Sequence, residues 1–106
     1  MSKIIDFANL AGPIYTGRPK GELARQHFRL DELDAQLDAV IVKIPESTYS
    51  ITNSFFLGMF GPSINRFGTR EGFLNHYQFD TSPMLQKRLD SHIERGLQPR
   101  GVLDVR

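Results

Sequence analysis

Cysteine is absent from the 106 residues of this chain. Its absence excludes disulfide bonds, thiolate nucleophiles, iron–sulfur clusters and zinc fingers, and it fits a reducing compartment. An excess of charge of one sign is also missing, because 13 Lys and Arg residues oppose 12 Asp and Glu residues for a formal net charge of +1. So small a charge does not indicate a nucleic acid or a membrane surface as the partner.

Long apolar runs are missing as well. The longest uninterrupted run, Ala39 to Val42, is far shorter than the ~20 residues that a membrane helix needs. The segment from Met1 to Ala11 has no apolar run of signal-peptide length. We therefore expect a soluble cytoplasmic protein. The chain length predicts one compact domain over residues 1–97, followed by a loosely ordered tail at 98–106.

The first half of the sequence contains two candidate strands on either side of a helix. A strand is expected near Ile4 to Phe7, and Ile14-Tyr15 is its candidate partner strand, so that the start of the chain forms either a hairpin or a bulged edge. The periodicity from Pro19 to about Leu33 predicts an amphipathic helix, whose stripe facing a sheet comprises Leu23, His27, Leu30 and Leu33. The apolar segment 39–44 predicts a central strand that is buried on both faces.

The second half predicts helices that alternate with one further strand. A helix is expected to begin at Ser54, within one residue, with Asn53 and Ser54 as N-cap candidates. A strand is expected at 76–79, and Ser82-Pro83 is expected to open the last helix. Together these elements predict an α/β fold, in which helices pack on a single small mixed sheet.

The sequence contains few candidates for catalytic, metal-binding or anion-binding residues. The three histidines are widely separated, and none has the spacing of a metal site. The acidic cluster of Asp31, Glu32, Asp34 and Asp38 is compatible with a Mg²⁺ or acid–base site, but we interpret it as a solvated helix end and turn. Arg18 and Lys20, at the start of the first helix, are either an anion-binding site or an ordinary basic turn. The sequence therefore predicts no catalytic residue, no metal site and no cofactor.

Three blocks of the sequence carry a resemblance to a known family. They are GRPKGELARQHFRLDEL at 17–33, AVIVKI at 39–44 and ITNSFFLGMFGPSI at 51–64. These blocks resemble the basic entry to the first long helix, the central strand and the Ser-Phe-led helix of the STAS-like family. That family comprises small bacterial and phage domains related to anti-sigma factor antagonists. The resemblance extends to about Leu97 and implies a β-α-β-α arrangement.

The resemblance also implies a function. In STAS domains that act as phospho-switches, an Asp-Ser-Ser-Gly turn opens this helix, and a partner anti-sigma kinase phosphorylates the second Ser. Here the corresponding residues are Thr52, Asn53, Ser54 and Phe55, so that only Ser54 matches at the phosphorylated position. The resemblance thus implies a non-enzymatic regulatory module that binds another protein, such as a kinase-like regulator, and that is switched at Ser54. The alternative role of Ser54 is to cap the helix.

The start of this helix is apolar on all sides, which indicates either deep burial or contact with a partner. We expect contact, through a docking surface that comprises Thr52, Asn53, Ser54, Phe55, Gly58 and Met59. A second hypothesis is a phage or mobile-element inhibitor that binds and blocks a host protein, for example a defence protein. A third is a small enzyme or nucleotide binder that uses Arg18, Lys20 and His27. The sequence leaves a homo-oligomer open.

Overall fold

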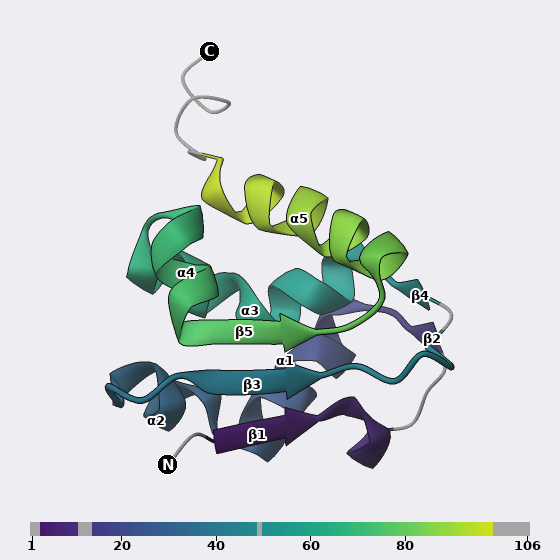
Figure 1. The fold of residues 1–106 in the computed structure, drawn as a ribbon, viewed down its shortest axis with the longest axis horizontal. Helices are drawn as coiled ribbons and strands as arrows, with labels where there is room; N and C mark the ends of the chain where they lie inside the picture. The colour runs from purple at the N-terminus through teal and green to yellow at the C-terminus, as the bar shows by residue number, and fades with distance from the viewer. Residues whose placement is uncertain (1–2, 11–13, 49, 99–106) are drawn as a thin grey trace.

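All described strands of the fold are paired in parallel. The computed structural model describes residues 3–10, 14–48 and 50–98 (Figure 1). The larger sheet has the order β1 (Lys3–Asp6), β3 (Val40–Lys43) and β5 (Tyr77–Asp80), while β2 (Ile14–Tyr15) pairs separately with β4 (Ser50–Ile51). The α/β class is therefore confirmed. The expectation of a single mixed sheet is wrong, because the described strands form two parallel sheets.

Three of the five described helices begin where the sequence supplies a side-chain cap. They are α1 (Arg18–Phe28), α2 (Leu30–Ala35), α3 (Asn53–Phe67), α4 (Arg70–His76) and α5 (Pro83–Leu97), and a 3-10 turn, η1 (Phe7–Asn9), follows β1. The side chains of Thr52, Thr69 and Ser82 accept hydrogen bonds from first-turn amides of α3, α4 and α5. The prediction for the last helix is confirmed. Of the expected tail, residues 99–106 lie outside the described residues.

The helix predicted over Pro19 to Leu33 is divided in two. Arg29 adopts a left-handed conformation (φ 55°) that ends α1 and begins α2. The predicted apolar stripe is wrong in its first half, because Leu23 is 62% exposed and His27 is also exposed. α1 instead buries the face of Gly21, Ala24 and Arg25.

The predicted hairpin between the first two strands does not form. Ile14 and Tyr15 pair with Ser50 and Ile51 of β4, and the Thr52 amide donates to the Tyr15 carbonyl at 2.9 Å. Parallel strands require a long crossover connection, here through α1, α2 and β3. The pairing therefore holds the start of α3 close to the start of α1.

Among residues 3–10, 14–48 and 50–98, the larger sheet has helices on one face only. The connections from β1 to β3 and from β3 to β5 each advance by one strand in the same direction. Because such crossovers are right-handed in nearly all proteins, successive crossovers in one direction place their helices on the same side. Figure 1 shows α1 and α3 behind the strands, with nothing in front of the strands among the described residues.

This one-sided layering corrects the prediction for the central strand. β3 is central, as expected, and Val40 and Val42 are buried against the helices. Ile41 is half-buried and Lys43 is exposed, so burial on both faces is wrong. Within the described ranges, no helix combines the length and the hydropathy needed to cross a membrane.

Two glycines allow α1 and α3 to pack backbone against backbone. A Cβ at Gly21 would lie 2.1 Å from the carbonyl oxygen of Phe55, and one at Gly58 would lie 2.4 Å from that of Arg18. Both positions are buried. The glycines therefore set the separation of the two helices that support the larger sheet.

Candidate functional site

Ser54 lies in the first turn of α3 with its side chain exposed. The N-cap is Thr52, whose Oγ1 accepts a hydrogen bond from the Phe55 amide at 3.2 Å. The prediction that Asn53 or Ser54 caps the helix is therefore wrong, although the helix begins within one residue of the predicted position. The Ser54 hydroxyl is accessible, and a phosphate there would lie at the positive end of the helix dipole. Phosphorylation of Ser54 stays a prediction.

The predicted docking surface around Ser54 is wrong for its apolar members. Phe55 and Met59 are 3% and 0% exposed, and Gly58 is buried. The Phe55 ring packs with its centroid 5.4 Å from that of Tyr15, beneath α1. Of the remaining members, Thr52 and Asn53 are half-buried. The apolar residues at this helix start thus belong to the core, and Ser54 is the one exposed member of the predicted surface.

Arg18 and Lys20 are not brought to one site. Arg18 lines a cleft of about 220 Å³ between the start of α1, the middle of α3 and the end of α5. This hollow, the arginine cleft, is also lined by Leu57, Pro62, Asn65, Arg95 and Gln98. Lys20 lines a different groove of about 250 Å³, beside the exposed side chains of Ile14 and Leu23. The two residues thus line different hollows, and an anion site that uses both of them stays a prediction beside the ordinary basic turn.

The three histidines have different neighbours. His27 is exposed beside Phe28, His76 Nε2 lies 2.7 Å from the Leu33 carbonyl oxygen, and His92 Nε2 lies 2.9 Å from that of Ile51. In the part of the chain that the structure describes, no three His, Asp or Glu residues are grouped closely enough to hold a metal ion.

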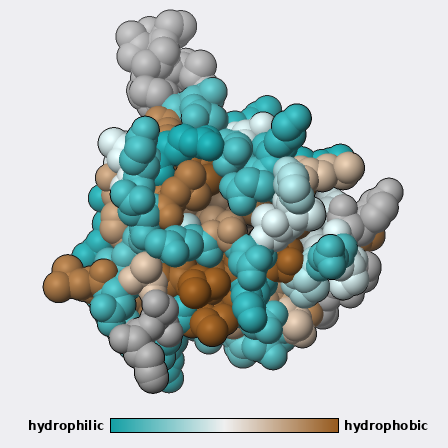
Figure 2. Space-filling model, in the orientation of Figure 1, coloured by the Kyte–Doolittle hydropathy of each residue, from teal (hydrophilic) through white to brown (hydrophobic). Residues whose placement is uncertain are grey.

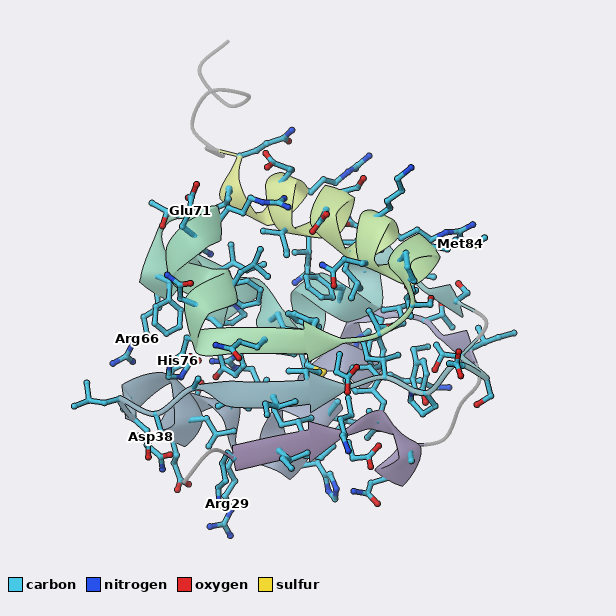
Figure 3. The ribbon with its side chains drawn as sticks, viewed as in Figure 1. Arg29, Asp38, Arg66, Glu71, His76 and Met84 are labelled. Carbon is cyan, nitrogen blue, oxygen red and sulfur yellow. The ribbon has the colours of Figure 1, made fainter. Side chains whose placement is uncertain are left out.

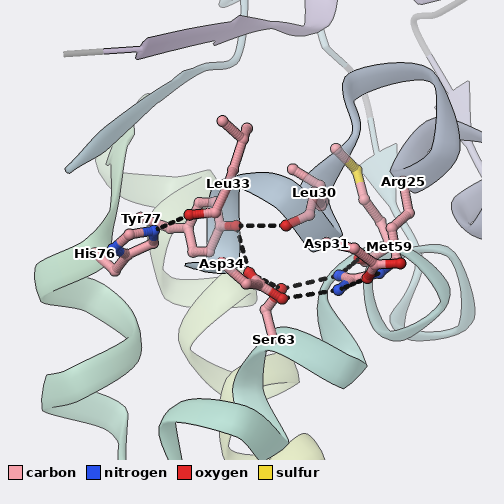
Figure 4. A network of polar contacts seen from close by, with 9 residues as sticks. All are labelled: Arg25, Leu30, Asp31, Leu33, Asp34, Met59, Ser63, His76 and Tyr77. Carbon is pink, nitrogen blue, oxygen red and sulfur yellow. Dashed lines mark hydrogen bonds and ion pairs between the residues drawn. The ribbon is translucent and has the colours of Figure 1, made fainter. Parts of the chain in front are cut away.

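The acidic cluster divides into exposed and buried members. Asp31, Glu32 and Asp38 are exposed, and Asp38 points into solvent at the edge of the molecule (Figure 3). Asp34 is buried, so the interpretation as a solvated helix end is wrong for this residue. Its Oδ2 accepts from Arg25 Nη2 at 2.8 Å, and its Oδ1 accepts from Ser63 Oγ at 2.7 Å and from the Tyr77 hydroxyl (Figure 4).

Arg25 uses all five of its N–H donors in this buried network. Nε and Nη2 donate to Asp31, Nη2 also donates to Asp34, and Nη1 donates to the Met59 carbonyl and to Ser63 Oγ. Burial, and then the hydrogen bond to Asp34, raise the pKa of Tyr77, so its hydroxyl remains a donor. Every N–H donor of Arg25 has an acceptor, and the network joins α1, α2, α3 and β5. We therefore assign the network a structural role.

The uncovered face of the larger sheet is a surface that the sequence prediction missed. Its residues are Ile4, Ile41 and Gln78 in one register row and Asp6, Lys43 and Asp80 in the next, and together they form the open sheet face. Ile4 is 56% exposed and Ile41 is half-buried between its neighbours. Figure 2 shows hydrophobic surface at the centre of this view with hydrophilic surface around it. The only sequence signal was the polar Lys43 at the end of an apolar strand.

Comparison with known proteins finds no family model that matches the chain, no similar curated protein and no similar solved structure. The resemblance to STAS-like domains therefore stays a prediction from the sequence blocks.

The environment of His92 predicts a pH dependence of stability. Desolvation lowers the pKa of His92, and the positive charges of Arg95 and Arg88 lower it further. The hydrogen bond to the Ile51 carbonyl has the opposite effect, smaller than that of desolvation, and raises it. Below the unfolded pKa of about 6.5, the unfolded chain binds the proton more readily than the folded chain, so stability falls as the pH drops from about 7. We expect a lower urea midpoint at pH 5.5 than at pH 7, and a smaller difference in His92→Gln. An equal pH dependence in both proteins would contradict this assignment.

Proposed function

We propose that this chain is a non-enzymatic regulatory module that binds a helix of a partner protein on its open sheet face. The observation that carries the proposal is a parallel sheet with one face that no described residue covers. Parallel sheets occur almost only with both faces covered, because their strands bury apolar side chains on both sides. Here the centre of the uncovered face is apolar through Ile4 and Ile41. A partner that covered it would complete the usual three-layer arrangement.

The size of the face favours a single helix as the occupant. Three strands spaced by ~4.8 Å, with four residues of ~3.3 Å each, span roughly 10 Å by 13 Å. One helix of ~10 Å diameter covers such an area. A second copy of the chain, paired face to face, would bury far less than the ~800 Å² per partner of a standard interface. The dimensions therefore support a helix over a homodimer.

The charges around the face indicate the chemistry of that helix. Asp6 and Asp80 flank Lys43 across the carboxyl ends of the strands, and Glu46 lines the adjoining hollow of about 590 Å³. Three carboxylates thus oppose one ammonium group at this end of the face. A complementary helix has apolar residues along one side and Lys or Arg beside them, which favours its association and orientation.

The proposal is tested with two synthetic amphipathic helical peptides that share a Leu stripe and carry either Lys or Glu on the flanks. We expect the Lys peptide to shift the backbone NMR signals of β1, β3 and β5 and to bind more tightly than the Glu peptide. Ile4→Glu should weaken binding by at least about tenfold, which is ~1.4 kcal/mol. Leu37→Glu is the matched control, because Leu37 is 100% exposed and lies outside the face.

Two results would overturn the proposal. One is that the Lys peptide shifts only NMR signals of residues on the helical side of the molecule. The other is equal binding of the Lys peptide to Ile4→Glu and to Leu37→Glu when both variants keep the wild-type melting temperature. In affinity captures from the native host, the proposal predicts a protein that is retained by the wild type and Leu37→Glu and lost with Ile4→Glu.

A further inference from the structure

The arginine cleft is lined by residues of α1, α3 and α5 and by Gln98, and it shares no residue with the open sheet face. Gly96 allows the end of α5 to approach α3, since a Cβ there would lie 3.0 Å from Leu57 Cδ2 and 3.1 Å from Ile64 Cδ1. Gly58 similarly allows the start of α1 to approach α3, at the Arg18 carbonyl. Two close helix contacts thus bring Arg18 and Arg95, which are 77 residues apart in sequence, to one hollow.

The positive charge of the cleft is not neutralised within the described chain. The ion pairs of arginine in the described ranges involve Arg25, Arg29 and Arg70, and none involves Arg18 or Arg95. Among the described lining residues there is no carboxylate. Arg18 and Arg95 are both exposed residues that line this hollow, and their like charges repel each other unless an anion is bound, so the cleft favours an anionic ligand.

The other lining residues narrow the class of anion. Asn65 and Gln98 bring side-chain amides, which can donate hydrogen bonds to oxygen atoms. Leu57 and Pro62 form an apolar wall. The volume of about 220 Å³ is below the ~300–1,000 Å³ of typical cofactor pockets, so the hollow suits a single phosphate group with a short organic attachment.

We infer that the arginine cleft binds a phosphate monoester group, with Arg18 and Arg95 as its two cationic contacts. Guanidinium groups match the oxygen atoms of phosphate in charge and geometry, and they can donate paired hydrogen bonds. The group could be carried by a small metabolite or by a phosphorylated side chain, because both present the same three oxygen atoms. This inference is independent of the proposed function, since it concerns another face of the molecule.

The test is an NMR titration at physiological salt with inorganic phosphate, phenyl phosphate and a short peptide that contains one phosphoserine. We expect saturable shifts for residues 57–65 and 95–98, and at least tenfold weaker binding by the double variant Arg18→Gln/Arg95→Gln. Both side chains are exposed, so this variant should keep the wild-type melting temperature. Tighter binding of the peptide than of phenyl phosphate would identify a phosphoprotein as the source, and the reverse order a small metabolite.

A double variant of two other exposed arginines is the control. Arg66 lies on α3 and points away from the molecule (Figure 3), and Arg88 lies on α5; neither lines the cleft. Arg66→Gln/Arg88→Gln removes the same net charge and should bind phosphate as the wild type does. Bound phosphate should also raise the pKa of His92, because Arg95 contributes to lowering it. Equal loss of binding in the two double variants, or shifts that never saturate, would overturn the inference.

Discussion

Gly58→Ala is expected to destabilise the protein by about 3 kcal/mol or more, because the new methyl group has no space between two helix backbones. The added Cβ would lie 2.4 Å from the Arg18 carbonyl oxygen and 3.2 Å from its carbonyl carbon. A flexible side chain could rotate away, but a backbone carbonyl moves only with its helix. Urea unfolding, followed by circular dichroism, measures the loss. Gly21→Ala should be at least as damaging, since its Cβ would lie 2.1 Å from the Phe55 carbonyl oxygen.

Gly61→Ala is the matched control on the same helix. A Cβ at Gly61 has its nearest neighbour, Leu57 Cβ, at 3.8 Å, which is ordinary contact. Alanine has a higher helix propensity than glycine by up to ~1 kcal/mol, so this variant should be as stable as the wild type or more so. A similar loss in Gly58→Ala and Gly61→Ala would show that the crossing of α1 and α3 does not depend on the missing side chain.

The elements that local sequence determines were predictable. The apolar stripes of α3 and α5 and the Ser82 cap of α5 located both helices, because such signals act within a few residues, although the cap of α3 is Thr52 and not the predicted Asn53 or Ser54. The partner of Ile14-Tyr15 was not predictable in this way. A hairpin pairs strands that are neighbours in sequence, so local patterns favour it. The observed parallel pairing with Ser50-Ile51 instead depends on the long crossover between the two strands. The division at Arg29 was also missed, since a left-handed arginine has no strong sequence signal.

The candidate sites were harder to predict, because a residue can contact a ligand or partner only if the fold leaves it exposed. The apolar start of α3 was compatible with a core and with an interface, and the contacts of Phe55 and Met59 place it in the core. The open sheet face results from the strand order β1-β3-β5. The spacing of apolar residues in the sequence does not reveal that order. Arg95 joins Arg18 through the packing of α5 on α3, and no spacing in the sequence connects them.

Arg25→Met is expected to cost about 3–5 kcal/mol, because it leaves the carboxylate of Asp34 buried without its positive partner. Methionine keeps much of the apolar volume of the side chain, so the loss reflects the missing charge and hydrogen bonds. Such a loss is comparable with the total stability of many domains, which is ~5–15 kcal/mol. Arg29→Met is the control, since the pair of Arg29 and Glu32 is exposed and 4.0 Å apart. Its free energy of unfolding should change by less than ~1 kcal/mol.

A double-mutant cycle with Asp34→Asn separates the charge from the shape of the network. The asparagine side-chain oxygen can still accept from Ser63 and Tyr77, but it needs no counter-charge from Arg25. The double variant Arg25→Met/Asp34→Asn should therefore be more stable than the sum of the single losses predicts, by up to ~3 kcal/mol. Strictly additive losses would mean that the two charges do not interact. In that case Arg25 would stabilise the fold through its bonds to the Met59 carbonyl and Ser63, which connect α1 to α3 directly.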